Sequence, residues 1–243
     1  MKKLIFILFI ITGIIFNLSG CKRESSEKKL NIDKYQIYNN EKNITEDKKV
    51  DKGIRRLKSN IDFNSNGIDD YGDFLEGGKI EAKNRPRYNG KYWQGGYPPE
   101  EIGVCTDVIW RAMKHGGYDL KAMIDNDISN YPQDYPNIEK PDPNIDFRRV
   151  KNQHIFFKKY AESLTIDIND IEEWQPGDIV IFRDDYHIGL ISDKRNEKGI
   201  THVIHNLGQR NREEDFFKKE KPVAHFRFDA ENIDHDILIP WDD

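Results

Sequence analysis

The sequence predicts an α+β fold in which a helix that bears a cysteine packs on an antiparallel β-sheet. Residues 104–115 place apolar side chains at helical spacing and are followed by a Gly-Gly pair, which ends a helix. Several short runs of β-branched and aromatic residues follow in the second half of the chain. The helix comes first and a meander of strands comes after it, which indicates a helix layer on a sheet.

The later elements each have a local signal. A second helix is predicted over residues 147–164. The stretch Trp-Gln-Pro-Gly-Asp at residues 174–178 predicts a turn, because proline and glycine favour tight backbone reversals. Short β-rich runs after this turn predict antiparallel strands over residues 179–182, 187–192, 201–206 and 223–228.

The first twenty residues have the pattern of a secretory signal. Two lysines precede a run over residues 4–16 that is almost entirely apolar. The run is shorter than the roughly 20 apolar residues that a membrane-spanning helix needs. Residues 18–21, Leu-Ser-Gly-Cys, resemble the bacterial lipobox, which implies that Cys21 is lipidated and becomes the first residue of the mature protein. The alternative is an ordinary signal peptide with Cys21 free or bonded to Cys105.

Composition and charge define the rest of the organisation. Residues 22–60 are polar and of mixed charge, which predicts a disordered tether after Cys21, and residues 61–243 have the length of one domain. The 38 Lys and Arg residues against 43 Asp and Glu residues give a net charge of −5, which argues against a nucleic-acid partner. Two cysteines exclude a multi-disulfide scaffold.

Cys105 has the position of a nucleophile. It lies at the start of the helix predicted over residues 104–115, where unpaired N–H groups and the positive end of the helix dipole stabilise a thiolate. A thiolate that attacks an amide also needs a base that takes up a proton and returns it, and imidazole suits both steps. Cys105 therefore requires a histidine partner from elsewhere in the chain.

His187 is the candidate base, because it begins a predicted strand and Gly189 leaves space on the same face. If Asp193 pairs with Gly199 across the hairpin, His187 faces His205 on the next strand. One more loop residue would instead place Asn206 opposite His187. The predicted third group is therefore His205, with Asn206 as the alternative, and either residue type can hold the imidazole of His187 in one orientation.

These motifs resemble the NlpC-type cell-wall cysteine hydrolases, which are papain-like enzymes. The resemblance implies that Cys105 starts a helix on an antiparallel sheet, that His187 is the base and that His205 is the polar orienter. It rests on residues 174–180, 187–190 and 203–206.

The chain also resembles the bacterial family called domain of unknown function 1287, over about residues 62–228. That closer resemblance implies fold and catalytic class more firmly than it implies a reaction, because the family has no settled substrate. It rests on residues 103–107, 141–150 and 203–206.

Four residues are candidates for substrate binding. Arg148 and Arg149 offer guanidinium groups for a carboxylate, such as those of cell-wall peptide stems, although Asp146 is an alternative internal partner for one of them. Asp107 lies in the first turn of the predicted helix and either positions substrate or complements the helix dipole. Tyr186 precedes the candidate base and is expected to line the groove.

Residues 61–75 contain a candidate calcium loop. Oxygen-bearing side chains occupy alternate positions there, and a glycine lies where the loop must turn sharply. The alternative to a calcium loop is a plain capped turn. The pattern departs from an EF-hand, because an aspartate occupies the twelfth position. The expected calcium would be structural, and the candidate ligands are Asp62, Asn64, Asn66, Asp70 and Asp73.

The function expected from these observations is an exported lipoprotein on the extracytoplasmic face of a bacterial membrane. Its domain would cleave an amide in a peptide or peptidoglycan stem, through a thioester on Cys105 and without a catalytic cofactor. Two alternatives stay open: a non-catalytic module that binds peptide or wall fragments, and an acyl or amide transferase that shares the thioester. The sequence does not predict the oligomeric state.

Overall fold

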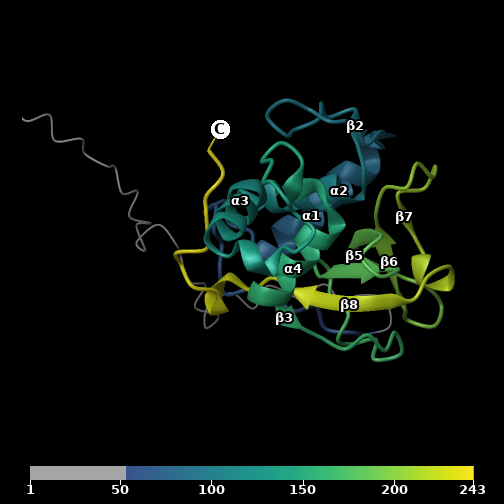
Figure 1. Cartoon of the computed structure of the whole chain (residues 1–243). Coiled ribbons are helices and arrows are strands. Elements are labelled where there is room, and N and C mark those ends of the chain that lie inside the picture. The colour runs from purple at the N-terminus through teal and green to yellow at the C-terminus, as the bar shows by residue number, and fades with distance from the viewer. Residues whose placement is uncertain (1–52, 243) are drawn as a thin grey trace, which may run out of the picture. The chain divides into compact units, whose positions relative to one another are not determined.

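Four α-helices gather on one side of a six-stranded sheet in the computed structural model (Figure 1). The structure describes residues 53–242. The predicted signal peptide, the lipidation of Cys21 and the tether as far as residue 52 lie outside the described residues. Within residues 53–242, none of the helices has both the length and the apolar composition needed to cross a membrane.

The helices differ from the prediction in number and length. The helix predicted over residues 104–115 is present, but the one predicted over residues 147–164 is shorter, because a 3₁₀ turn precedes it and the backbone becomes extended at Ala161. Two further helices were not predicted. The bounds are α1 Asp70–Asn84, α2 Cys105–His115, α3 Leu120–Asn130 and α4 Val150–Tyr160, with 3₁₀ turns η2 Pro132–Asp134, η3 Asp146–Arg148, η4 Phe216–Lys218 and η5 Ala230–Asn232.

A Gly77-Gly78 pair inside α1 explains why this helix was not predicted, since glycine disfavours helix interiors. In the structure Gly77 permits close contact between α1 and α2. A Cβ atom on Gly77 would lie 2.8 Å from the Cα atom of Ala112. The helix starts at Asp69, whose side chain accepts a hydrogen bond from the backbone N–H of Gly72.

The six-stranded sheet is antiparallel, as predicted, with strand order β3-β8-β4-β5-β6-β7. The predicted strand over residues 179–182 is confirmed without change, and the strand that begins at His187 runs further than predicted. A separate short pair, β1 and β2, is parallel and precedes α2. The bounds are β1 Arg87–Tyr88, β2 Ile102–Gly103, β3 Glu162–Ser163, β4 Ile179–Phe182, β5 His187–Arg195, β6 Thr201–Ile204, β7 Glu213–Glu214 and β8 Pro222–Arg227.

The predicted register between β5 and β6 is wrong by two residues. It would pair Ile188 with Ile204, whereas the structure pairs Leu190 with Ile204. The cause is the position of the turn, because Arg195 pairs with Thr201 and the pairing at this end of the hairpin is four residues from the predicted one. An irregularity between Ile191 and Arg195, where β5 has two more residues than the facing part of β6, reduces the difference to two. A shift of two residues keeps every side chain on its predicted face, because the side-chain period of a strand is two.

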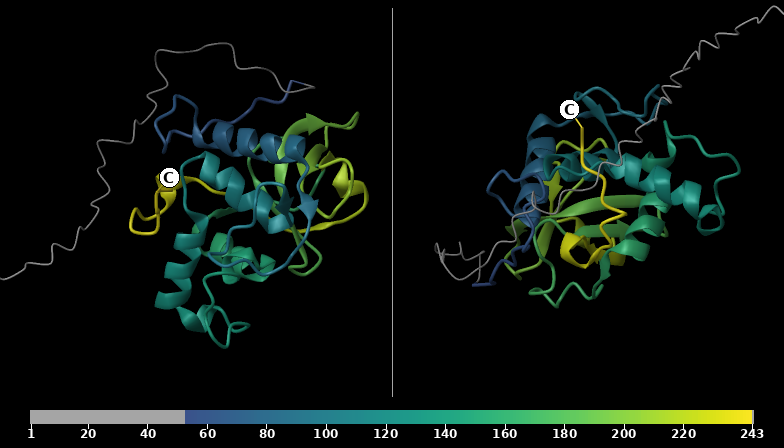
Figure 2. Two further views of the ribbon diagram at one scale, coloured as in Figure 1. Left: turned by 90° about the horizontal axis from the view of Figure 1, so that it is seen from above. Right: turned by 90° about the vertical axis from the view of Figure 1, so that its left-hand side faces the viewer.

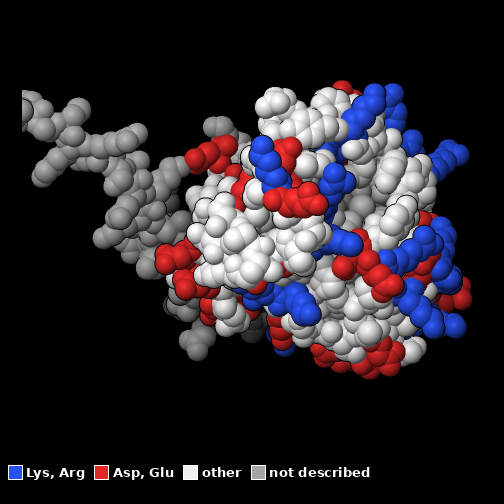
Figure 3. Space-filling view, viewed as in Figure 1, with Lys and Arg blue, Asp and Glu red and all other residues white. Residues whose placement is uncertain are grey.

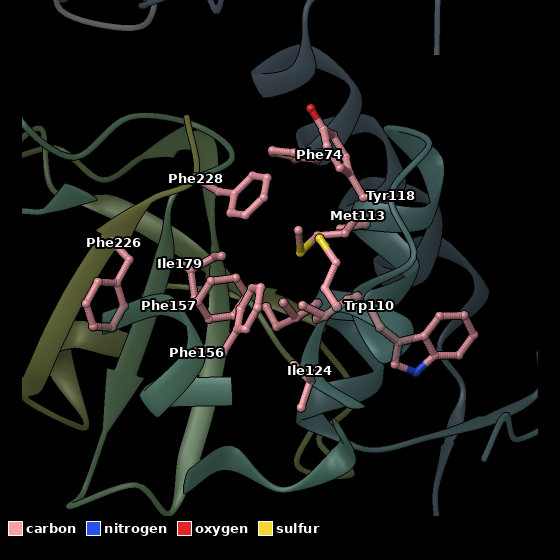
Figure 4. Close-up of a cluster of buried hydrophobic side chains, with 14 of the residues drawn as sticks. Phe74, Trp110, Met113, Tyr118, Ile124, Phe156, Phe157, Ile179, Phe226 and Phe228 are labelled. Atoms are coloured by element: carbon pink, nitrogen blue, oxygen red, sulfur yellow. The ribbon is translucent and has the colours of Figure 1, made fainter. Parts of the chain in front are cut away.

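Apolar side chains cover both faces of the sheet. The larger core lies between the helices and the sheet, and Figure 4 shows Phe74 of α1, Met113 of α2 and Phe157 of α4 on the side of the helices that faces Ile179 of β4 and Phe226 of β8. Two further views show the helices on one face of the sheet (Figure 2). A smaller core covers the opposite face with Trp174, Val180, Phe182, Ile191, Val203, Phe216 and Phe217.

The body begins earlier than predicted. Residues 54–60 were assigned to the tether, but Ile54 is buried and the backbone N–H of Leu57 donates a hydrogen bond to the side chain of Gln175. The backbone N–H of Ser59 bonds to Asp69, the residue that caps α1. These long-range contacts satisfy backbone groups that a tether would leave to water.

Charged side chains of both signs are interspersed over the face of the molecule in Figure 3. No single sign dominates that face.

Candidate active site

Cys105 is the first residue of α2, and a set of buried polar contacts fixes that helix start. The Asp107 carboxylate accepts a hydrogen bond of 2.7 Å from the backbone N–H of Val104, which precedes the helix. The hydroxyl of Thr106 donates to the carbonyl of Arg148 at 3.0 Å. Cys105 itself is free and only 6% exposed.

The Cys105 thiol lies beside the start of β5. The backbone N–H groups of Ile188 and Thr106 lie near the sulfur and favour the thiolate, but burial outweighs them and raises the pKa of Cys105 to about 11. The negative charge of Asp107 acts in the same direction as burial. The expectation that the helix start lowers the pKa of the thiol is therefore wrong, because removal of water disfavours the charged sulfur more than the N–H groups stabilise it.

His187 and His205 contact each other through their rings. His187 Nε2 lies 2.9 Å from His205 Nδ1, and both residues are almost completely buried. Burial lowers the pKa of each imidazole to about 3. Nearby positive charges act in the same direction, from Arg183 on His187 and from Lys219 on His205. Both rings are therefore neutral at neutral pH.

Glu214 supplies a fourth polar group. Its Oε1 atom lies 3.3 Å from His205 Nε2, which favours a proton on that nitrogen. His205 Nδ1 can then accept the Nε2–H of His187, which leaves the lone pair on His187 Nδ1 exposed to a partner. Among the described residues His187 Nδ1 has no hydrogen-bond partner. The side-chain amide nitrogen of Gln209 also lies 3.2 Å from His205 Nε2 and 3.3 Å from His205 Nδ1. With the proton on His205 Nε2, His187 has the tautomer that a general base requires.

Sequence reasoning missed Glu214, and the reason is its local structure. Glu214 lies on β7, a strand of two residues that pairs with β6 at Val203. A two-residue strand has no periodic pattern that a sequence reading can detect. The only sequence signal is a carboxylate a few residues after His205, which is too common to select.

Asn206 forms hydrogen bonds that stabilise the fold, and it does not orient the imidazole of His187. Its Nδ2 donates to the carbonyls of Pro86 and Gly103 at 3.1 and 2.9 Å, and its Oδ1 accepts from Gly208. These bonds tie the end of β6 to the chain just before Cys105. Of the two candidates for the third group, His205 is the one that contacts His187.

Asp107 and Arg148 bind each other in a closed, buried ion pair. Two parallel hydrogen bonds of 2.8 Å join the carboxylate to the guanidinium, and Arg148 also donates to the carbonyl of Lys91. Asp107 further accepts from the indole N–H of Trp110. The two candidates for substrate binding therefore satisfy one another, and the predicted alternative partner Asp146 is not involved.

Arg149 and Tyr186 differ from that pair because they are exposed, and both line the cleft that contains Cys105. Tyr186 is 64% exposed. The cleft has a volume of about 780 Å³. It is lined chiefly by β1, the start of α2, the residues that lead into α4, and the β4–β5 turn, through Tyr88, Gly90, Val104, Cys105, Thr106, Asn137, Ile138, Glu139, Lys140, Ile145, Asp146, Arg148, Arg149, Val150, Lys151, Asn152, Asp185 and Tyr186.

The turn that leads into His187 has an unusual backbone. Arg183, Asp184 and Asp185 all have positive φ angles of 52°, 47° and 69°, which L-residues rarely adopt. His154 on α4 contacts the Asp185 carboxylate through Nδ1. A side-chain contact from another element thus holds the strained turn in front of the candidate base.

The predicted calcium loop is closed by its own hydrogen bonds. The Asp62 carboxylate accepts from the backbone N–H groups of Asn66 and Gly67 at 3.0 and 2.8 Å. The side-chain amides of Asn64 and Asn66 both donate to the Asp73 carboxylate. Three of the five predicted ligands lie in the loop before α1, and Asp70 and Asp73 lie in the first turn of that helix. The two amides present nitrogen and not oxygen to Asp73.

Asp70 is poorly suited to calcium. It is fully buried, its oxygens accept hydrogen bonds from the backbone of Phe63 and the hydroxyl of Tyr118, and burial raises its pKa to about 7. The hydrogen bonds match those of a plain capped turn. A calcium ion would have to displace both amide donors from Asp73, so calcium binding stays a prediction.

His187 gives the first testable prediction. Its ordinary pKa is about 6.5 and its folded pKa is about 3, so the unfolded chain binds more protons between pH 6 and pH 4. Stability should therefore fall as the pH falls, by about 1–1.4 kcal/mol per pH unit for this group. Urea titrations at several pH values should show that the slope is reduced by that amount in His187→Asn. An unchanged slope in His187→Asn would show that folded His187 is already charged.

Comparison with known proteins gives a family and no activity. The model of the family described as "Domain of unknown function (DUF1287)" matches residues 75–228. The uncharacterized protein YijF of Escherichia coli (strain K12) is 36% identical over 149 residues, which are 59% of this chain and 72% of that protein. No solved structure matches the chain. The family match covers well over half of the sequence and includes Cys105, His187 and His205, so this chain belongs to the DUF1287 family.

Proposed function

We propose that this protein is a papain-like cysteine hydrolase of the NlpC type, which cleaves an amide in a peptide or peptidoglycan stem. One observation supports the proposal above all others. The ring contact between His187 and His205 leaves His187 Nδ1 unpartnered, and the Cys105 thiol lies near the backbone N–H of Ile188, the residue that follows His187. A buried imidazole nitrogen without a partner is costly unless it has a chemical use.

The proposed reaction starts from a neutral thiol and a neutral imidazole. Cys105 Sγ attacks the carbonyl carbon while its proton moves to His187 Nδ1, and the backbone N–H of Cys105 stabilises the oxyanion. The proton then moves from His187 to the departing amine as the C–N bond breaks. The resulting thioester is hydrolysed by a water that gives its proton to His187, which frees the acid and restores the thiol.

Glu214 and His205 act as positioning residues in this scheme. When His187 becomes protonated, His205 Nδ1 accepts a hydrogen bond from the imidazolium, and the Glu214 carboxylate stabilises the positive charge across His205. The burial that keeps both rings neutral at rest also makes this stabilisation strong. The scheme is therefore a general-base mechanism and not one that starts from a preformed ion pair.

The proposed place of action is the extracytoplasmic face of a bacterial membrane, with the protein anchored by lipid on Cys21. This part of the proposal is supported by the signal pattern of residues 1–21 alone. The competing functions are a module that binds wall fragments in the same cleft, and a transferase in which an amine replaces water at the thioester.

The test is incubation of the full chain with a mixture of peptidoglycan stem peptides. New amino groups and an acyl adduct on Cys105 should appear by mass spectrometry. Cys105→Ala should form neither product, and His187→Ala should slow release by about 10²–10⁴-fold. His235→Ala is the matched control, and circular dichroism checks the folding of each variant.

Two outcomes would contradict the hydrolase proposal. Cleavage that persists in Cys105→Ala would show that Cys105 is not the nucleophile. Binding of the stem peptides without turnover, at equal affinity in the original protein and in Cys105→Ala, would favour the binding module instead.

A further inference from the structure

We propose that the cleft beside Cys105 selects substrates with a free carboxylate near the scissile amide, and that Arg149 binds this carboxylate. The inference rests on the proposed function, because it concerns the same cleft. It extends that function from any peptide amide to an amide in an acidic peptide or next to a peptide C-terminus.

Three of the four basic residues that line the cleft have no internal partner, the exception being Arg148. Lys140, Arg149 and Lys151 all line the cleft and are exposed. Unlike most charged side chains near the site, none of the three forms a side-chain hydrogen bond or ion pair with any residue in the range 53–242. Three cationic side chains without an ion-pair partner lie in one cleft, and their positive charge attracts an anion.

The acidic residues of the cleft form no ion pair with these three cations. Asp185 contacts His154, and Asp146 accepts a hydrogen bond of 2.6 Å from the backbone N–H of Asp142. Arg149 lies close enough to Asp146 to lower its pKa, against the larger effect of burial, but the two form no ion pair. Glu139 is the remaining acid and is exposed at the cleft.

Arg149 is the best placed of the three cations to recognise a carboxylate. Its guanidinium can donate two parallel hydrogen bonds to two carboxylate oxygens, whereas a lysine acts as a point charge. Its neighbour Arg148 shows the same geometry already satisfied, because both of its parallel bonds go to Asp107. Arg148 therefore stabilises the start of α2, whereas the guanidinium of Arg149 has no partner among the described residues and can bind a ligand.

The first test compares two alkylating reagents that differ in one charge, bromoacetyl-glycine and bromoacetyl-glycinamide. Each forms a thioether with Cys105 Sγ and releases bromide, and the rate is read on the Cys105 peptide of the full chain by mass spectrometry. Arg149→Gln should lower the acid-to-amide rate ratio by about fivefold or more, since one guanidinium–carboxylate contact of about 1 kcal/mol or more is lost. The charge-matched control Arg210→Gln, an exposed site outside the cleft, should leave the ratio unchanged.

A second measurement separates this inference from the proposed function. N-acetylalanine and N-acetylalaninamide are titrated into Cys105→Ala and followed by NMR, which needs no reactive thiol. The acid should bind more tightly than the amide, and Arg149→Gln in the same background should remove that preference. If Cys105 reacts with neither reagent, the assignment of Cys105 as the nucleophile is wrong. The NMR titration would still test whether Arg149 binds a carboxylate.

Two results would overturn the inference. The first is an acid-to-amide preference that Arg149→Gln leaves intact in both measurements. The second is a binding experiment that contradicts a carboxylate site, either because N-acetylalanine binds no more tightly than its amide or because phosphate displaces it better than acetate does. Displacement of N-acetylalanine by inorganic phosphate at a lower concentration than by acetate would indicate a phosphate site.

Discussion

Replacing Arg148 with methionine is expected to lower the free energy of unfolding by about 3–5 kcal/mol, because it leaves the buried Asp107 carboxylate without its partner. The carboxylate keeps its bonds to the backbone of Val104 and the indole of Trp110, but these do not replace a full positive charge. Urea unfolding followed by tryptophan fluorescence measures the change.

The neighbouring residue provides the matched control for this measurement. Arg149→Met removes an exposed guanidinium that has no partner among the described residues, so the free energy of unfolding should stay within about 0.5 kcal/mol of the original. If the two variants differ by less than about 1 kcal/mol, the Asp107–Arg148 pair does not stabilise the start of α2.

Alkylation of Cys105 by iodoacetamide at pH 8 is expected to be roughly a hundredfold slower in the folded protein than in urea. A thiol with a pKa of about 11 is a thiolate in roughly one molecule per thousand at pH 8, against about one in four for an unperturbed thiol with a pKa near 8.5. The rate should rise tenfold per pH unit without a plateau as far as pH 10. Mass spectrometry of the Cys105 peptide separates its rate from that of Cys21.

The same experiment tests the resting state of the catalytic pair. His187→Ala should not raise the pH midpoint further, because the neutral imidazole does not stabilise a thiolate at rest. A plateau below pH 8 that disappears in His187→Ala would demonstrate a preformed thiolate–imidazolium pair. That result would replace the general-base scheme with the mechanism expected from the helix position alone.

The sequence predicted the strands best where hydrophobic pattern alone determines structure. Residues 179–182 form a strand at the predicted bounds, because four consecutive apolar residues are buried on both faces. The contact between His187 and His205 was predicted although the register was not. The hairpin turns further along the chain than predicted, and after the irregularity in β5 the pairing differs by two residues, an even shift that returns the same face to His187.

Features that depend on tertiary contacts were not predictable. The polar stretch at residues 54–60 gives no sign that Gln175, far along the chain, accepts its backbone hydrogen bond. Arg148 and Arg149 are equivalent in sequence, yet only the first reaches a buried carboxylate. The pKa of Cys105 depends on how much water the fold excludes, which outweighs the local effect of the helix start. Glu214 reaches His205 through a two-residue strand that has no pattern.

The burial of the sheet on both faces also determines how the site fluctuates. All of β4 and residues 187–192 of β5 are buried, so their amide protons should exchange with solvent mainly through global unfolding. Residues 183–186, between these strands, include the three with positive φ and end in an exposed tyrosine, so they can exchange through local opening at lower cost. The boundary between the slowest and the fastest exchanging amides of this hairpin therefore falls at His187. The proposed base lies on the slowly exchanging side of that boundary, and Tyr186, which lines the cleft, lies on the rapidly exchanging side.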